Sequence, residues 1–210
     1  MPRLNDYSRY NSVMSTVAVL GTTGMLGNSV VQEFSSFAGE LIGSARGIIT
    51  DDRLARSFSL DANSNDLPKQ LHDLGEGDFV INCVGVIKPY IDDNSASSRK
   101  NALLINGLFP YLLEALATER GFKVIQIATD CVFSGINGRY IETDLHDAVD
   151  VYGKSLALVP SVFETGIVLQ AGTMDNLFDL EVDAVYDFDW VDVQLENGVW
   201  SLATYPSLKH

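Results

Sequence analysis

Three glycines spaced three residues apart constrain the fold of this chain more than any other feature. They stand in Gly21-Thr22-Thr23-Gly24-Met25-Leu26-Gly27, between an apolar run at 16–20 and a helical pattern at 25–37. In such a strand–turn–helix the first glycine permits a tight turn, the second lets the backbone approach a pyrophosphate, and the third lets the helix pack closely. The helix N-terminus then offers N–H groups to phosphate. The sequence therefore predicts a dinucleotide-binding loop; a tight turn without a ligand is the alternative. Its expected cofactor-binding residues are Gly21, Thr23, Gly24, Met25, Leu26 and Gly27.

Apolar β-rich runs alternate with helical patterns along most of the chain. Further strands are expected at 40–44, 56–60, 78–83 and 123–127, and helices at 66–74, 95–120 and 150–158, with Pro110 kinking or restarting the longest helix. Alternating strands and helices build a parallel sheet with two covered faces, and near-continuous apolar strands agree with burial on both sides. We therefore expect an α/β fold, a Rossmann-like doubly wound parallel sheet.

The pattern changes after about Gly172. Apolar and acidic residues alternate from 178 to 195, and Asn197-Gly198 suits the positive φ angles of a type I′ turn, so strands are expected at about 188–195 and 199–205. The stretch 160–210 holds nine acidic residues and one lysine. We expect three parts: a polar N-terminal arm at 1–14, a Rossmann NAD(P)-binding domain at 15–172, and an acidic C-terminal β-hairpin appendage at 173–210.

The formal net charge of −14 limits the partners of the chain. Nucleic acid and anionic membranes repel an acidic surface, so neither is expected to bind. No apolar run reaches the roughly 18 residues of a membrane span. The polar first 13 residues lack the apolar core of a secretory signal. A cytoplasmic protein, or a part of a particle assembled inside the cell, is therefore expected.

Cysteines and candidate metal ligands indicate no further chemistry. Cys83 and Cys131 are too few for a disulfide framework and are expected to be free buried thiols. The three histidines show no metal-ligand spacing. The aspartates between 175 and 192 match no EF-hand loop, which needs ligands at alternate positions and a central glycine. No metal site is expected.

Residues after the second and third expected strands bear on the adenosine end of a cofactor. An NAD-binding Rossmann unit carries an acid about 20 residues after the glycine loop, for the ribose hydroxyls. Here the second strand runs into Arg46, which suits a 2′-phosphate, so NADP is expected in preference to NAD. A solvated surface arginine is the alternative. Asp61, after the third strand, is expected at the adenine edge.

Several motifs, taken in order, resemble one family. The glycine loop is followed by 82–85 (Asn-Cys-Val-Gly), 128–135 (Ala-Thr-Asp-Cys-Val-Phe-Ser-Gly), 140–144 (Tyr-Ile-Glu-Thr-Asp) and 151–155 (Val-Tyr-Gly-Lys-Ser). Together they resemble an extended short-chain dehydrogenase/reductase. Their order is similar to that of the dTDP-4-dehydrorhamnose reductases and related sugar-nucleotide-binding reductases, over about residues 16–158. The resemblance adds Cys83, Val84 and Gly85 to the expected cofactor-binding residues.

The resemblance implies hydride transfer from NADPH to a keto sugar nucleotide. In the family's mechanism a tyrosine donates a proton to the developing alkoxide, and a serine or threonine hydroxyl polarises the carbonyl. A lysine lowers the pKa of the tyrosine and holds the nicotinamide ribose. Carried over, Tyr152 is the proton donor and Thr129 the carbonyl partner.

Three departures affect the substrate side. Leu156 stands where the family has its lysine, and Lys154 would point about 200° away from Tyr152 on a helix. Cys131 stands where the family usually has tyrosine, and nothing after Val159 resembles the family's sugar-binding lobe. A well-tuned general acid contributes about 10²- to 10⁴-fold, and losing the lysine removes much of that.

Two functions follow from these residues. The first is an NADP-dependent reductase of a keto sugar nucleotide, impaired at its catalytic end. The alternative is a non-catalytic Rossmann scaffold, a structural or regulatory component of a larger assembly, including a viral particle. It would meet protein partners, or copies of itself, through the N-terminal arm and the β tail. The family resemblance favours the first function, and the altered site, with Leu156 in place of the lysine, favours the second.

Overall fold

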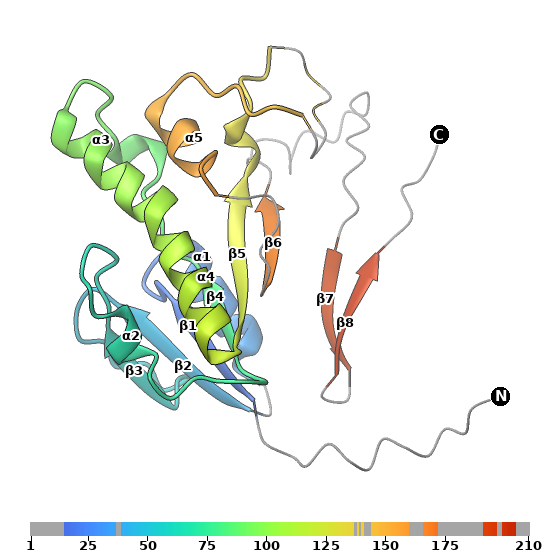
Figure 1. Cartoon of the computed structure of the whole chain (residues 1–210). Coiled ribbons are helices and arrows are strands. Elements are labelled where there is room, and N and C mark those ends of the chain that lie inside the picture. The colour runs from blue at the N-terminus through green and yellow to red at the C-terminus, as the bar shows by residue number, and fades with distance from the viewer. Residues whose placement is uncertain are drawn as a thin grey trace.

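Helices cover both faces of a parallel sheet in this protein, with the long helix α4 on one face and α1 on the other (Figure 1). The computed structural model describes residues 15–36, 39–136, 138, 140, 144–159, 166–171, 191–196 and 199–204. The expected arm at 1–14, the expected domain boundary at 172 and the turn residues Asn197 and Gly198 lie outside the described residues.

The sheet has six strands in the order β3-β2-β1-β4-β5-β6. They are β1 (Thr16–Leu20), β2 (Glu40–Ala45), β3 (Arg56–Ser59), β4 (Phe79–Asn82), β5 (Lys123–Thr129) and β6 (Gly166–Ala171). Every neighbouring pair is parallel. The order reverses between β1 and β4, as in the Rossmann fold, whose ligands bind outside the carboxyl ends of the strands at this point. The predicted doubly wound parallel sheet is confirmed.

The helices connect the strands. They are α1 (Met25–Phe34), α2 (Leu67–Gln70), the 3₁₀ turn η2 (Lys88–Tyr90), α3 (Ala96–Ala102), the π-helix η3 (Leu103–Leu108), α4 (Phe109–Arg120), the 3₁₀ turn η4 (Asp130–Val132) and α5 (Val151–Leu156). The helices α3, η3 and α4 follow one another without a gap. The irregularity expected at Pro110 is the π-helix η3, which ends just before the first turn of α4, where Pro110 lies. A π turn next to proline adapts the backbone to the missing N–H donor.

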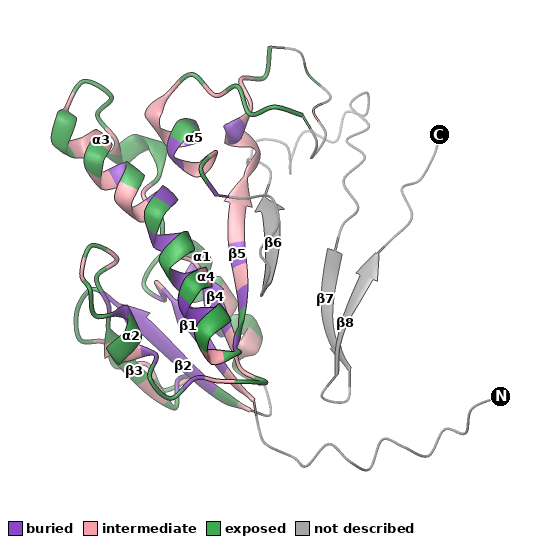
Figure 2. Cartoon of the chain, viewed as in Figure 1, coloured by how far each residue is buried: buried purple, intermediate pink, exposed green. Residues whose placement is uncertain are grey.

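The central strand β1 sends alternate side chains into two cores, because successive side chains of a strand point to opposite faces. Leu20 belongs to the same buried cluster as Phe109 and Leu113 of α4. Val19 instead packs in a second cluster with Val31 of α1. Figure 2 shows buried residues along β1 and β2. The carboxyl end of β1, where the glycine loop begins, is therefore held from both sides of the sheet.

Two further strands, β7 (Val191–Glu196) and β8 (Val199–Thr204), pair antiparallel, with Glu196 opposite Val199. The sequence predicts this pairing from the Asn-Gly turn signal. The sequence does not predict β6, because its apolar run is too short to show the period of a strand or of a helix. Among the described helices, none is long and apolar enough to cross a membrane.

Neighbouring leucines on α4 provide a test of the core. Leu113 is fully buried, whereas Leu112 is 45% exposed. We expect Leu113→Ala to lower the free energy of unfolding by about 2–5 kcal/mol, because it removes a buried side chain and leaves a cavity. Leu112→Ala is the matched control and should cost much less. Urea denaturation followed by circular dichroism measures both, and equal losses would contradict the packing.

Candidate functional site

The glycine loop is tied to the carboxyl end of β2. Gly21 has a φ of 85°, in the left-handed region that glycine adopts without steric cost. Its N–H donates to the Ser44 carbonyl at 3.0 Å, and the Thr22 N–H donates to the same oxygen at 2.9 Å. The Gly24 N–H then donates to the Gly21 carbonyl at 3.0 Å and closes the turn. These bonds hold the loop against the carboxyl end of β2.

The third glycine of the loop stands where no larger residue fits. A Cβ atom on Gly27 would lie 2.2 Å from the carbonyl oxygen of Gly21. A Cβ atom on Gly21 would in turn lie 3.2 Å from the Cys83 carbonyl oxygen and 3.2 Å from Val84 Cγ2. The loop is therefore packed between α1 and the end of β4. Cys83 and Val84, expected from the sequence to contact the cofactor, do lie beside the loop.

The N-terminus of α1 is open to solvent. Gly24 is its N-cap residue and supplies no side-chain cap, and Met25 is 76% exposed. The N–H groups in the first turn of a helix have no intrahelical acceptor, and the helix dipole places partial positive charge there. Thr23 and Leu26 are exposed beside them. This geometry fits the pyrophosphate of a dinucleotide.

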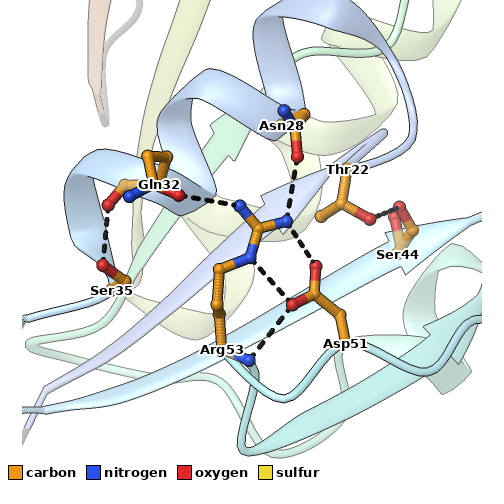
Figure 3. Close-up of polar contacts among 7 residues, drawn as sticks. All are labelled: Thr22, Asn28, Gln32, Ser35, Ser44, Asp51 and Arg53. Carbon is orange, nitrogen blue, oxygen red and sulfur yellow. Dashed lines mark hydrogen bonds and ion pairs between the residues drawn. The ribbon is translucent and has the colours of Figure 1, made fainter.

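A pocket of about 280 Å³ adjoins the loop. Its lining comes from the glycine loop, α1 and the connection between β2 and β3: Thr22, Thr23, Asn28, Ile49, Thr50, Asp51 and Arg53. Figure 3 shows the Arg53 side chain between the Asp51 carboxylate and α1. The sequence does not predict a role for Asp51 and Arg53, because only the folded β2–β3 connection brings them beside the glycine loop.

Arg46 and Asp61, the two residues expected at the adenosine end, do not line this pocket. Arg46 is exposed just past β2, and its carbonyl accepts a hydrogen bond from Ser59 Oγ at 3.0 Å. The Asp61 carboxylate accepts the Asn63 N–H at 2.9 Å within a local turn. Their contacts with a cofactor stay predictions.

The substrate end lies where β5 meets α5. Thr129 is the last residue of β5, and Tyr152 is half-buried in the first turn of α5. Asp150 caps α5 by accepting the Gly153 N–H at 2.8 Å. A Cβ atom on Gly153 would lie 2.2 Å from the Cys131 carbonyl oxygen, so glycine lets α5 approach β5. The tyrosine and threonine that the sequence pairs thus come close enough together for Thr129 to lower the pKa of Tyr152.

The electrostatic environment raises the pKa of Tyr152. Burial is the main cause, and the charges of Cys131, Asp130 and Asp150 add to it, while the hydrogen bond with Thr129 acts in the opposite direction. At the expected lysine position Leu156 is half-buried, and Lys154 is exposed. A cation beside the tyrosine would lower its pKa. The net effect of the described groups around this tyrosine is a raised pKa.

An ion pair between Lys88 and Asp150, which the sequence does not predict, lies at this end of the site. Lys88 Nζ, in the turn after β4, lies 2.6 Å from Asp150 Oδ2. The Asp150 carboxylate raises the pKa of Lys88, chiefly through this hydrogen bond. Lys88 is thus paired with the cap of α5. The two residues are distant in sequence, so no local pattern indicates the pair.

Asn106, on the π-helix η3, joins the two halves of the site. Its buried side-chain amide donates to the Val86 carbonyl at 2.9 Å and to Ser155 Oγ at 3.0 Å, and its Oδ1 accepts the Val86 N–H at 2.8 Å. Ser155 Oγ also donates to the Tyr152 carbonyl at 2.8 Å. One side chain therefore positions the loop after β4 and the helix that carries Tyr152.

The surroundings of the two cysteines and the arrangement of the possible metal ligands bear on thiolate and metal chemistry. Burial raises the pKa of the Cys83 thiol to about 12 and also raises the pKa of Cys131, so neither is an activated thiolate. Both cysteines are free. Within the described residues, no group of three or more histidine, cysteine, aspartate or glutamate side chains is arranged to hold a metal ion.

The parallel sheet, the glycine loop at its reversal point, and the tyrosine–threonine pair define an extended short-chain dehydrogenase/reductase fold. The family model for the RmlD substrate binding domain matches residues 14–162, and the chain belongs to this family. The family resemblance inferred from the sequence motifs is confirmed.

Several known proteins are similar to this chain over about half of their own length. Methionine adenosyltransferase 2 subunit beta of Danio rerio is 28% identical over 161 residues, covering 74% of this chain and 46% of that protein. The Bacillus anthracis dTDP-4-dehydrorhamnose reductase in complex with NADP is 19% identical (TM-score 0.56; 76% of this chain, 53% of that chain). The Bacillus cereus UDP-glucuronic acid 4-epimerase in complex with NAD is 18% identical (TM-score 0.56; 68% and 49%). The two structures show the shared fold, and the chain spans about half the length of each relative.

The surroundings of Tyr152 predict that it ionises above the ordinary tyrosine pKa of about 10. We expect the difference in phenolate absorbance between the wild type and Tyr152→Phe to appear only above about pH 10. Tyr90→Phe, which removes a tyrosine that is 78% exposed, serves as the matched control. An ultraviolet titration measures both differences. A Tyr152 component below pH 10 would show that a cation acts on the phenol.

Proposed function

We propose that this chain binds a nicotinamide dinucleotide across its glycine loop, with NADP preferred over NAD. The observation that carries the proposal is the open N-terminus of α1, held at the reversal point of the sheet by the contact of Gly27 with Gly21. The NADP and NAD complexes of the two related structures support the same cofactor class. Arg46 is the proposed contact for a 2′-phosphate. The other proposed contacts are Gly21, Thr23, Gly24, Met25, Leu26, Gly27, Asp61, Cys83, Val84 and Gly85.

The proposed reaction is reduction of a keto sugar nucleotide of the dTDP-4-dehydrorhamnose type. The family membership and the reductase relative support this substrate class. When bound, a reduced nicotinamide would supply the hydride. In the proposal Tyr152 donates the proton to the substrate oxygen, and Thr129 donates a hydrogen bond to that oxygen. The effect of Thr129 on the pKa of Tyr152 requires the two side chains to lie close together, which supports their acting on one substrate atom.

We further propose that the reaction is slow in this chain. The pKa of Tyr152 is raised, so the phenol gives up its proton less readily to a developing alkoxide. Leu156 brings no charge to correct this. A well-tuned general acid contributes about 10²- to 10⁴-fold to a rate, and the deficit should be of that order.

A non-catalytic role in an assembly is the second candidate. The carboxylates of Asp130 and Asp150 beside Tyr152 favour it, and the zebrafish relative is by name a subunit of a larger enzyme. In this role the arm at 1–14 and the acidic segment at 173–210 would be docking segments attached to a Rossmann domain at 15–172. Deletion of either segment should then change the oligomer mass in light scattering, and an unchanged mass in both deletions would remove this candidate.

Cofactor binding is tested by titrating NADPH and following nicotinamide fluorescence. We expect saturable binding by the wild type and its loss in Gly27→Ala, because the added methyl group would lie 2.2 Å from the Gly21 carbonyl oxygen. Gly47→Ala is the matched control, since a Cβ atom there meets nothing within 4 Å. No binding by the wild type at millimolar NADPH would overturn the proposed function.

Restoring the lysine tests the catalytic deficit. We expect Leu156→Lys to raise the rate of NADPH-dependent reduction of a 4-keto sugar nucleotide by about tenfold or more, because a cation beside Tyr152 lowers its pKa. Lys154→Ala, at an exposed position of the same helix, should leave the rate unchanged. Adding Tyr152→Phe should abolish the gain. Binding of NADPH without any gain in Leu156→Lys would favour the second candidate.

A further inference from the structure

The pocket beside the glycine loop contains a charged pair that the contacts proposed above leave out. Asp51 Oδ1 accepts Arg53 Nε–H at 2.8 Å, and Asp51 Oδ2 lies 2.6 Å from Arg53 Nη2 (Figure 3). The same Oδ1 also accepts the Arg53 backbone N–H at 3.1 Å. This is the bidentate fork geometry that arginine forms with carboxylate or phosphate.

Arg53 is held from the other side by α1. Its Nη2 group donates to Asn28 Oδ1 at 2.9 Å, and its Nη1 group donates to Gln32 Oε1 at 3.3 Å. A guanidinium has five N–H donors, and four of them are engaged in these contacts. The arginine therefore stands at the pocket wall with its charge directed to Asp51.

The position of the pocket in the sheet identifies the part of a dinucleotide that reaches it. Its lining comes from the glycine loop, α1 and the β2–β3 connection, on the β2 side of β1. Tyr152 and Thr129 lie at the end of β5, on the opposite side of β1. A dinucleotide whose pyrophosphate lies on the loop and whose nicotinamide lies near Tyr152 directs its adenosine ribose toward this pocket.

The charge balance of the pocket bears on the 2′ substituent of that ribose. A 2′-phosphate carries close to two negative charges at neutral pH, whereas a 2′-hydroxyl carries none. Asp51 repels the phosphate and occupies the two N–H groups of Arg53 that a phosphate would use. The 2′-hydroxyl can instead donate a hydrogen bond to the Asp51 carboxylate.

We propose that Asp51 and Arg53 together decide between a 2′-phosphate and a 2′-hydroxyl on the bound adenosine ribose, with Asp51 holding Arg53 back from the phosphate. This inference rests on the proposed binding of a nicotinamide dinucleotide. It assigns the discrimination to a pair in the β2–β3 connection, in addition to the exposed Arg46. In the wild type the preference for NADP is then small, below about tenfold.

Removing the Asp51 carboxylate frees Arg53. We expect Asp51→Asn to raise the ratio of NADP⁺ affinity to NAD⁺ affinity by about tenfold or more, the effect of gaining a hydrogen bond to a charged group. The double variant Asp51→Asn/Arg53→Gln should lose this gain, because the receiving guanidinium is absent. NAD⁺ affinity itself should change by less than about threefold in Asp51→Asn, because the amide oxygen of the variant side chain still accepts a hydrogen bond from the 2′-hydroxyl.

Isothermal titration calorimetry of NADP⁺ and NAD⁺ measures these ratios without reference to turnover. The matched control is the pair Arg56–Asp73, another arginine–aspartate contact that does not line the pocket. Asp73→Asn should leave the ratio unchanged. Thermal melts of each variant show whether it folds. If Arg53→Gln fails to fold, Arg53→Lys replaces it, since lysine keeps the charge but loses the fork.

The outcomes separate this inference from the proposed function. A raised ratio in Asp51→Asn that disappears in the double variant supports the inference. A ratio unchanged in Asp51→Asn, with loss of NADP⁺ preference in Arg46→Gln alone, overturns it and leaves the proposed cofactor binding in place. A wild type that binds neither NADP⁺ nor NAD⁺ overturns both.

Discussion

The contact between Gly27 and the carbonyl of Gly21 determines the rest of the site. Because a Cβ atom at position 27 would lie 2.2 Å from that oxygen, only glycine allows α1 to start so close to the end of β1. The start of α1 then lies at the reversal point of the sheet, where β1 separates β2 from β4. The N-terminus of the helix, the pocket on the β2 side and the Cys83–Val84 turn on the β4 side all follow from this placement.

The two ends of the crevice differ in their electrostatics. At the loop, the exposed N-terminus of α1 favours anions, and the Asp51–Arg53 pair is balanced. At the end of β5, burial and neighbouring negative charge raise the pKa of Tyr152. Asn106 links the loop after β4 to α5, through hydrogen bonds to Val86 and to Ser155. The two ends therefore differ in charge preference: the loop end favours anions, and the β5 end favours the neutral phenol of Tyr152.

Local patterns predicted the elements whose physical signal is local. The glycine spacing located the loop, alternating strands and helices indicated the doubly wound sheet, and the Asn-Gly signal indicated the pairing of β7 with β8. β6 was missed because a short apolar run carries no distinctive period. Arg53 and Lys88 were missed for another reason. Arg53 meets Asn28 and Gln32 across 25 and 21 residues of sequence, and Lys88 meets Asp150 on a different element.

By itself the sequence determined which backbone positions had to be glycine, which strands were apolar on both faces, and that the position four residues after Tyr152 carries no charge. These properties depend on side-chain size, spacing and charge along the chain. Only the tertiary structure decided which distant groups act on one another: Arg53 with Asn28 and Gln32 of α1, Lys88 with Asp150 at α5, and the charges of Asp130 and Asp150 on Tyr152. The physical reason is that Coulomb interactions and desolvation depend on distance and burial in space, which the strand order sets and the linear sequence does not show.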